Sequence, residues 1–241
     1  NLGGRDDEQP HDDDDDDDDE DDDDNDYEES SSSSMFRFRE AASRCKGRMD
    51  VVLNDDALSG SKKDQFQRCI IENETIRNII RTLFGGDDNV KLVYSGLIFN
   101  WPGSSTQPWH QDGQPLFPES RNSIQIQASI PSYAINVFVP LSNEDGEIER
   151  GPTEFLPGSH LWSSIAEFDE LSSPNKTVIG PSLQQGDVLM YDYRVCHRGT
   201  ANLSQIENNN PRRILYLMFS RPWFDDHINF DYTKSAKSLW E

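Results

Sequence analysis

A histidine and an aspartate separated by one residue are the clearest candidates for chemistry in this chain. They lie in the segment Trp109-His110-Gln111-Asp112-Gly113. In an extended backbone, residues two positions apart point to the same side, so His110 and Asp112 can reach one ion. An imidazole nitrogen and a carboxylate oxygen from one short segment supply two ligands of a facial metal site, and a third ligand must come from elsewhere.

His197 is the best candidate for that third ligand. It ends a predicted strand over residues 187–197, on the face that it shares with alternate residues such as Tyr191 and Tyr193. A histidine at the end of such a strand can point into the mouth of a barrel. Two histidines and one carboxylate, with the remaining positions open, suit Fe(II) and the activation of O2. Catalytic zinc can use the same ligands, whereas structural zinc normally takes a closed, cysteine-rich site.

Spacing alone leaves a structural interpretation open. Short His-x-Asp pairs are common and usually make surface hydrogen bonds, and His197 could equally be a buried histidine of the core. The other histidines are His11, in an acidic N-terminal segment, and His160 and His227, for which loop or packing roles are expected. The residues therefore define a candidate triad without deciding that it binds a metal.

The elements that must position these residues are mostly short β-strands. Runs rich in apolar and aromatic residues alternate with clusters of Pro, Gly, Asn and Asp, and they cover residues 91–99, 123–130, 133–141, 153–157, 177–183, 187–197 and 213–219. Many short strands without intervening helices favour a sandwich or a closed barrel, and their number suits a double-sheet jelly roll. Upstream, apolar residues at helical spacing over 64–84, followed by Gly85-Gly86, predict one amphipathic helix packed against this core.

The N-terminal 35 residues differ sharply from the rest of the chain. They hold 19 of the 45 acidic residues but a single basic residue, Arg5. Such a segment cannot bury enough apolar surface to offset its ordering entropy, and its like charges repel one another. We therefore predict a disordered acidic tail over residues 1–35 and one folded domain over residues 36–241. The tail could bind cations or a basic partner, or act only as a solubilising extension.

Composition also argues against several classes of function. Beyond residue 35 the chain is mildly acidic, with 26 acidic and 21 basic residues, and it shows no basic stripe of the kind that binds nucleic acid. No apolar run approaches the roughly 18–20 residues that span a bilayer, so a membrane partner is not expected. Three scattered cysteines without a CxxC pair favour a reducing, cytoplasmic location.

Four longer segments resemble the phytanoyl-CoA dioxygenase family. They are WHQDG (109–113), NVFVPLSNEDGEIERGPTEFLPGSH (136–160), GDVLMYDYRVCHRGTANLS (186–204) and RRILYLMFSRPWF (212–224), and they occur in the family's order. The resemblance spans about residues 90–224 and implies a mainly β, double-stranded β-helix (jelly roll) with flanking helices. It also implies Fe(II), O2 and 2-oxoglutarate as co-substrate. It assigns His110, Asp112 and His197 as the iron ligands, and it places His160 in the family's Pro-Gly-Ser-His turn.

The resemblance further implies an arginine shortly after the distal histidine. A guanidinium group pairs bidentately with a carboxylate, which suits the distal carboxylate of 2-oxoglutarate. The candidates are Arg212 and Arg213. Strand alternation cannot choose between them, because both faces of the following strand are apolar, but the family's spacing favours Arg212.

Four further residues are candidates for contacts in the site. Gln111 could contact the co-substrate, or be a solvent-facing loop residue, and Asn136 could point toward the co-substrate, or be an ordinary polar strand residue. Trp101 and Trp109 flank the loop that leads into the site. They could form walls of the substrate pocket or pack in the core. No catalytic residue is expected beyond the metal ligands.

The expected activity is therefore hydroxylation or desaturation of a small organic substrate, with release of succinate and CO2. Asp112 argues against halogenation, because relatives that halogenate carry a small residue at this position. Two alternatives remain, a jelly-roll binding protein without turnover and a cupin-like iron oxygenase that does not use 2-oxoglutarate. No motif selects the substrate, although the lack of a Lys/Arg cluster for a CoA phosphate weakly disfavours acyl-CoA.

Overall fold

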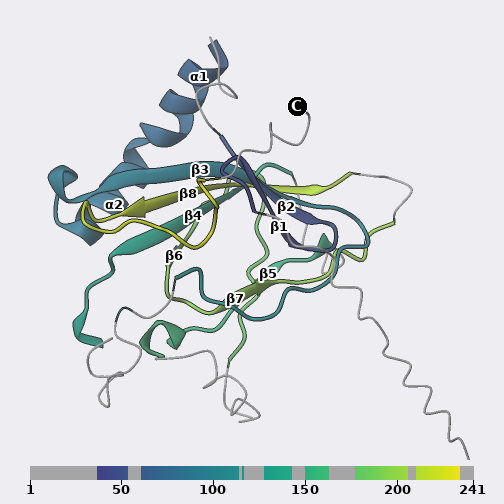
Figure 1. The fold of residues 1–241 in the computed structure, drawn as a ribbon. Helices are drawn as coiled ribbons and strands as arrows, with labels where there is room; N and C mark the ends of the chain where they lie inside the picture. Colours follow the sequence, from purple (N-terminus) through teal and green to yellow (C-terminus); the bar gives the residue numbers. More distant parts are fainter. Residues whose placement is uncertain are drawn as a thin grey trace, which may run out of the picture. The chain divides into compact units, whose positions relative to one another are not determined.

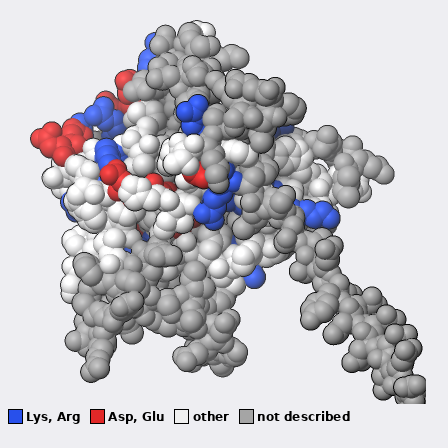
Figure 2. Space-filling view, in the orientation of Figure 1, with Lys and Arg blue, Asp and Glu red and all other residues white. Residues whose placement is uncertain are grey.

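A computed structural model describes residues 37–53, 61–113, 116, 128–142, 150–162, 177–205 and 210–233 of the chain. Within these ranges, a six-stranded sheet packs over a two-stranded sheet, and helices lie on the outer side of the larger one (Figure 1). The predicted acidic tail and most of the predicted strand 123–130 lie outside the described residues. On the face in view in Figure 2, acidic and basic side chains are interspersed.

The large sheet has the strand order β1-β2-β3-β8-β4-β6, and each neighbouring pair is antiparallel. Its strands are β1 (Ala41–Cys45), β2 (Arg48–Val52), β3 (Lys91–Asn100), β8 (Arg212–Ser220), β4 (Ala134–Pro140) and β6 (Leu189–Asp192). The small sheet pairs β5 (Thr153–Phe155) with β7 (His197–Gly199). Two packed antiparallel sheets make a jelly roll, so the predicted mainly β fold is confirmed.

Alternation along the strands gives the large sheet two different faces. Its outer face packs against α2 (Glu74–Phe84) in one apolar cluster of Ile76, Ile80, Phe84, Ile135, Val137, Val139, Leu215, Leu217 and Phe219. Fully burying one such side chain contributes about 1.5–3 kcal/mol, so this cluster holds the helix on the sheet. The inner face, which includes Phe138, Ile214 and Tyr216, is left to line the space between the two sheets.

The prediction of one helix over 64–84 is wrong in its continuity. The segment divides into α1 (Ser61–Phe66), a π-helical turn η1 (Gln67–Ile71) and α2. The break occurs because Asn73 Oδ1 accepts hydrogen bonds from Thr75 N at 3.1 Å and Ile76 N at 3.2 Å, which starts a new helix. Gly85 ends α2 with φ of 79°, as its position in the sequence predicts.

Two short 3-10 turns also lie in the described ranges. They are η2 (Asp87–Asn89) and η4 (Ser159–Leu161). No helix in the described part of the chain is long and apolar enough to cross a membrane.

The predicted continuous strand 187–197 is also wrong, and its break matters for the site. β6 ends at Asp192, a turn follows, and β7 begins at His197. The Asp192 carboxylate accepts hydrogen bonds from Arg194 N at 3.0 Å and Arg194 Nε at 2.9 Å, a local arrangement that competes with strand pairing. The chain therefore leaves the large sheet and enters the small one, where His197 pairs with Phe155.

Two smaller differences concern strands at the edges. The predicted strand 177–183 makes only an isolated bridge, between Ile179 and Phe155. No element is predicted from the sequence for residues 41–52, yet they form the β1–β2 hairpin, whose turn places Gly47 at φ of 70°. This hairpin extends the large sheet beyond β3 and supplies part of the wall of the space between the sheets.

Replacing Asn73 with alanine removes the oxygen that caps α2, so we expect the free energy of unfolding to fall by about 1 kcal/mol. Urea denaturation followed by circular dichroism measures this loss. Asn78→Ala, at an exposed position within the same helix, is the matched control and should not lower stability, because alanine has the higher helix propensity. Equal losses in the two variants would contradict the capping role.

Candidate metal centre

A cavity of about 250 Å³ lies between the inner face of the large sheet and the segments that carry His110, Asp112 and His197. All three candidate ligands border it, together with residues from β2, β3, β4, β6 and β8. The sheets therefore form the walls, and the candidate ligands enter from a loop and from β7.

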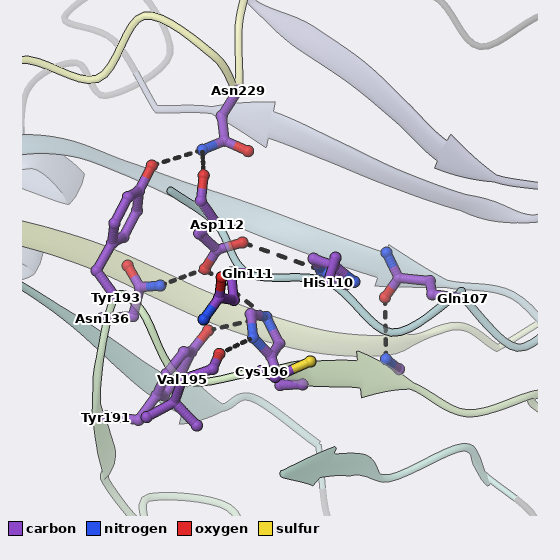
Figure 3. A network of polar contacts seen from close by, with 12 residues as sticks. Gln107, His110, Gln111, Asp112, Asn136, Tyr191, Tyr193, Val195, Cys196 and Asn229 are labelled. Atoms are coloured by element: carbon purple, nitrogen blue, oxygen red, sulfur yellow. Dashed lines mark hydrogen bonds and ion pairs between the residues drawn. The ribbon is translucent and has the colours of Figure 1, made fainter. Parts of the chain in front are cut away.

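A backbone bridge joins the two histidines. His110 N donates to His197 O at 3.0 Å, and His197 N donates to His110 O at 2.9 Å, which sets the ring centroids 4.5 Å apart. Asp112 Oδ1 lies 3.9 Å from His110 Nε2, and Asp112 Oδ2 lies 3.7 Å from His197 Nε2. One ligand atom from each residue thus lies within 4.8 Å of the other two. Figure 3 shows Asp112 with His110 and Asn136 around its carboxylate.

Both imidazole rings are oriented for coordination through Nε2. His110 Nδ1 is 2.9 Å from Pro108 O, and His197 Nδ1 is 3.0 Å from Val195 O. A backbone carbonyl accepts from Nδ1–H, which leaves the Nε2 lone pair available for a metal. Burial, and after it the neighbouring His197, lowers the pKa of His110 to about 4, so this ring is neutral at neutral pH, as a metal ligand must be.

Two other elements fix the aspartate. Asn136 on β4 donates through Nδ2 to Asp112 Oδ2 at 2.5 Å. Asn229 Nδ2, near the end of the described chain, donates to the backbone oxygen of Asp112 at 3.2 Å and to Tyr193 Oη at 2.8 Å. Gly113 allows this packing, because a Cβ atom there would lie 2.2 Å from the Tyr193 ring. Hydrogen bonds to both the side chain and the backbone of Asp112 therefore fix its position.

The donor set fits a mononuclear iron centre. Two imidazole nitrogens and one carboxylate, all bordering the same cavity, leave coordination positions on the cavity side for other ligands. Hydrogen-bonded partners behind each ligand are the usual support of such a site. The ligand assignment of His110, Asp112 and His197 is thus consistent with the geometry and is taken up below as a proposal.

Strand alternation in the sequence does not choose between Arg212 and Arg213, but the two lie in different surroundings in the structure. Arg212 is only 2% exposed and lies on the inner face, opposite Asn100, which in turn lies opposite Arg48. Arg213 points outward, and its Nη2 donates to Asn210 Oδ1 at 2.8 Å. Arg48 borders the cavity itself. Arg48, Asn100 and Arg212 are neighbours across β2, β3 and β8, and we call the two arginines the Arg48–Arg212 row.

Arg48 is a candidate that sequence reasoning missed. Its Nη1 donates to Gln107 Oε1 at 3.1 Å and its Nη2 to Thr200 O at 2.7 Å. The guanidinium occupies the space above Gly199, where a Cβ atom would lie 1.4 Å from Nη1. Burial lowers the pKa of Arg48 to about 10, and the charge of Arg212 adds to this effect, so Arg48 stays protonated at neutral pH. The turn at Gly47 is the one signal for this hairpin in the sequence.

The remaining candidates from the sequence lie in different surroundings. Gln111 borders the cavity, but its Nε2 donates to the backbone oxygens of Ser159 at 3.1 Å and Arg194 at 2.6 Å. This amide therefore ties the metal-binding loop to two neighbouring segments. Asn136 borders the cavity as well and is bonded to Asp112. Both remain candidates for contact with a co-substrate.

The two tryptophans do not border the cavity. Trp101 stacks on Phe99 with ring centroids 5.4 Å apart, and the Arg198 guanidinium lies 4.4 Å from the centroid of Trp109. His160, in η4, is not part of the cluster around Asp112. The structure thus brings together the predicted metal ligands, Gln111 and Asn136, and places both tryptophans in packing positions.

Asn229→Ala should weaken metal binding, because it removes the hydrogen bonds to the Asp112 backbone and to Tyr193. We expect affinity for Fe(II) to fall by about 10- to 100-fold, the usual effect of removing a residue that orients a ligand. Anaerobic calorimetric titration measures this, with Asn210→Ala at an exposed position as control. Unchanged affinity in Asn229→Ala would show that the C-terminal segment does not support the centre.

Solved structures show the same fold. AviO1 from Streptomyces viridochromogenes Tue57 aligns with a TM-score of 0.53 at 20% identity, covering 79% of this chain and 75% of that one. HygX from Streptomyces hygroscopicus, solved with nickel and 2-oxoglutarate bound, aligns with a TM-score of 0.54 at 14% identity, covering 76% and 73%. At these identities the similarity establishes the fold alone.

Curated relatives are similar in sequence over much of the chain. Dioxygenase hkm4 of Aspergillus hancockii is 29% identical over 145 residues, which are 60% of this chain and 44% of that protein. Multifunctional dioxygenase prhA of Penicillium brasilianum is 26% identical over 201 residues, covering 77% and 64%. The chain thus spans less than two thirds of the length of these relatives. The family model described as phytanoyl-CoA dioxygenase (PhyH) matches residues 5–213, and the chain belongs to this family.

Proposed function

We propose that this protein is an Fe(II)- and 2-oxoglutarate-dependent dioxygenase that hydroxylates or desaturates a small organic substrate. The observation that carries the proposal is the convergence of His110, Asp112 and His197 on one wall of a cavity that Arg48 also borders. Family membership supports it, as does the nickel and 2-oxoglutarate in the structure of HygX. When bound, iron would supply O2 activation, so that oxidation of 2-oxoglutarate to succinate and CO2 accompanies oxidation of a substrate C–H bond.

The three ligands are arranged to hold the metal without protons on the binding atoms. Each histidine gives its Nδ1–H to a backbone oxygen, which fixes Nε2 toward Asp112. Asn136 holds one oxygen of the Asp112 carboxylate. Because this carboxylate is present, the position that halogenating relatives leave to a small residue is filled, which favours hydroxylation or desaturation.

The buried arginines supply the charge that a dicarboxylate needs. We place the distal carboxylate of 2-oxoglutarate against the Arg48–Arg212 row of the large sheet, since guanidinium groups bind carboxylates bidentately and stay charged. Gln107, which accepts from Arg48 Nη1 and from Gly199 N, keeps that guanidinium in place. Apolar side chains of the inner face, among them Ile98 and Ile214, exclude water from the same cavity.

A coupled assay tests the proposal. Purified protein with Fe(II), ascorbate and 2-oxoglutarate should release succinate slowly without a prime substrate, and faster when a screen of small organic compounds supplies one. Iron binding without succinate under any condition would instead favour a jelly-roll binding protein. Substrate oxidation that does not require 2-oxoglutarate would favour a cupin-like oxygenase.

The arginine assignment has its own test. Arg212→Ala and Arg48→Ala should each weaken 2-oxoglutarate binding by about tenfold or more, since a hydrogen bond to a charged group contributes about 1.5–3 kcal/mol. Fe(II) affinity, measured in parallel by anaerobic calorimetry, should change far less. Arg213→Ala is the matched control on the outer face. A larger loss in Arg213→Ala than in Arg212→Ala would reverse the assignment.

A further inference from the structure

The hydroxyl of Tyr191, on β6, lies against the coordinating atom of one candidate ligand. Tyr191 Oη is 3.4 Å from His197 Nε2. His197 Nδ1 is 3.0 Å from Val195 O, so Nδ1 carries the proton and Nε2 is an acceptor. The tyrosine hydroxyl therefore donates to the lone pair that a metal at this centre requires. Tyr191 and Val195 belong to the same network of polar contacts as Asp112 (Figure 3).

The hydroxyl of Tyr191 keeps its proton at neutral pH. Burial raises the pKa of Tyr191 well above its usual value, and the charge of Asp112 adds to the rise. A protonated phenol supplies a single O–H donor. Because coordination uses the lone pair of His197 Nε2, the hydroxyl must give up its bond to that atom when a metal binds.

Packing holds the ring of Tyr191 in place beside the centre. The ring lies edge-on to Phe138 and Phe155, with ring centroids 5.1 and 5.0 Å away. Tyr191 also pairs with Asn136 across β6 and β4. Side chains in a close-packed interior have little room to move, so metal loading can turn the O–H bond but leaves the oxygen where it is.

The cavity supplies the next acceptor for this hydroxyl. Asp112 Oδ2 already accepts from Asn136 Nδ2, and coordination takes further electron density from the same carboxylate. Tyr191 borders the cavity, on the side where coordination positions are open. A co-substrate that fills these positions brings negatively charged oxygen atoms, and hydrogen bonds to such atoms are roughly twice as strong as neutral ones.

We propose that Tyr191 is a positioning residue that exchanges His197 Nε2 for the co-substrate as its hydrogen-bond acceptor. Without metal, its hydroxyl donates to Nε2; in the loaded centre, it donates to an oxygen atom of 2-oxoglutarate. The inference rests on the proposed function, since it requires a metal and 2-oxoglutarate in this cavity. Tyr191 thus opposes the binding of metal alone and favours the binding of co-substrate to the loaded centre.

Nickel(II) tests the exchange without turnover, and HygX was solved with nickel and 2-oxoglutarate bound. Tyr191→Phe keeps the packed ring and removes only the hydroxyl. We expect its affinity for Ni(II) to rise about threefold, because no hydrogen bond at Nε2 has to be broken. Its affinity for 2-oxoglutarate in the nickel-loaded state should fall about tenfold, because a bond to a charged acceptor is lost. Calorimetric titration of metal-free and then of nickel-loaded protein measures both.

Tyr216→Phe is the matched control for this variant. Tyr216 borders the same cavity, and its Oη makes no hydrogen bond with the described residues, so neither affinity should change. A role of the Tyr191 hydroxyl in packing alone would lower both affinities or neither. Opposite signs support the exchange, whereas an affinity for Ni(II) that does not rise, or an affinity for 2-oxoglutarate that does not fall, overturns it.

Tyrosine absorption gives a second readout in the wild-type protein. The near-ultraviolet absorption of a phenol shifts when its hydrogen-bond acceptor changes, so titration of metal-free protein with colourless Zn(II) should produce a tyrosine difference spectrum. The spectrum should be lost in Tyr191→Phe and retained in Tyr216→Phe. A difference spectrum of the same size in Tyr191→Phe would assign the change to another tyrosine and reject the exchange.

The wild-type titration separates this inference from the proposed function. If nickel-loaded wild-type protein does not bind 2-oxoglutarate, the proposed function and this inference fail together. If it does bind 2-oxoglutarate, and Tyr191→Phe binds both ligands as the wild-type protein does, the inference alone fails and the dioxygenase stands.

Discussion

The backbone bridge between His110 and His197 is the interaction on which the rest of the site depends. Two hydrogen bonds, of 3.0 and 2.9 Å, join a loop to a strand of the small sheet. They bring together two ligands that are 87 positions apart in the sequence, and Asp112 follows two residues later on the same loop. Because the bridge is made of backbone atoms, both imidazole rings remain available to border the cavity. Hydrogen bonds from Nδ1 of each ring to a backbone oxygen then fix the orientation of the rings.

The large sheet has separate tasks on its two faces. Its outer face packs an apolar cluster against α2, while its inner face carries buried polar side chains such as Arg48, Asp50 and Arg212. Burying such groups is costly unless partners are provided. The apolar packing of the outer face against α2 therefore offsets the cost of burying these polar groups on the inner face.

Much of the fold was predictable, because period-two patterns and turn residues depend on local sequence. The division of the predicted helix over residues 64–84 was not predictable from periodicity, since the Asn73 cap outweighs the helical pattern on both sides of it. The break after Asp192 was missed because side-chain bonds to Arg194 end the strand within a pattern that still alternates. The family's spacing favoured Arg212 over Arg213, but only the strand register shows that the two lie on opposite faces of the sheet. Arg48 could not be identified from the sequence, because a hairpin some 150 residues upstream of β7 borders the same cavity only in the folded chain.

Asn229 belongs to a segment that follows the family match, which ends at residue 213, yet it contacts both sides of the site. One amide group accepts from Arg44 and donates to the backbone of Asp112. A displacement of Arg44 would therefore reach the loop that carries Asp112 through the side chain of Asn229. The C-terminal segment thus ties the β1–β2 hairpin to the loop that carries Asp112 through one amide group.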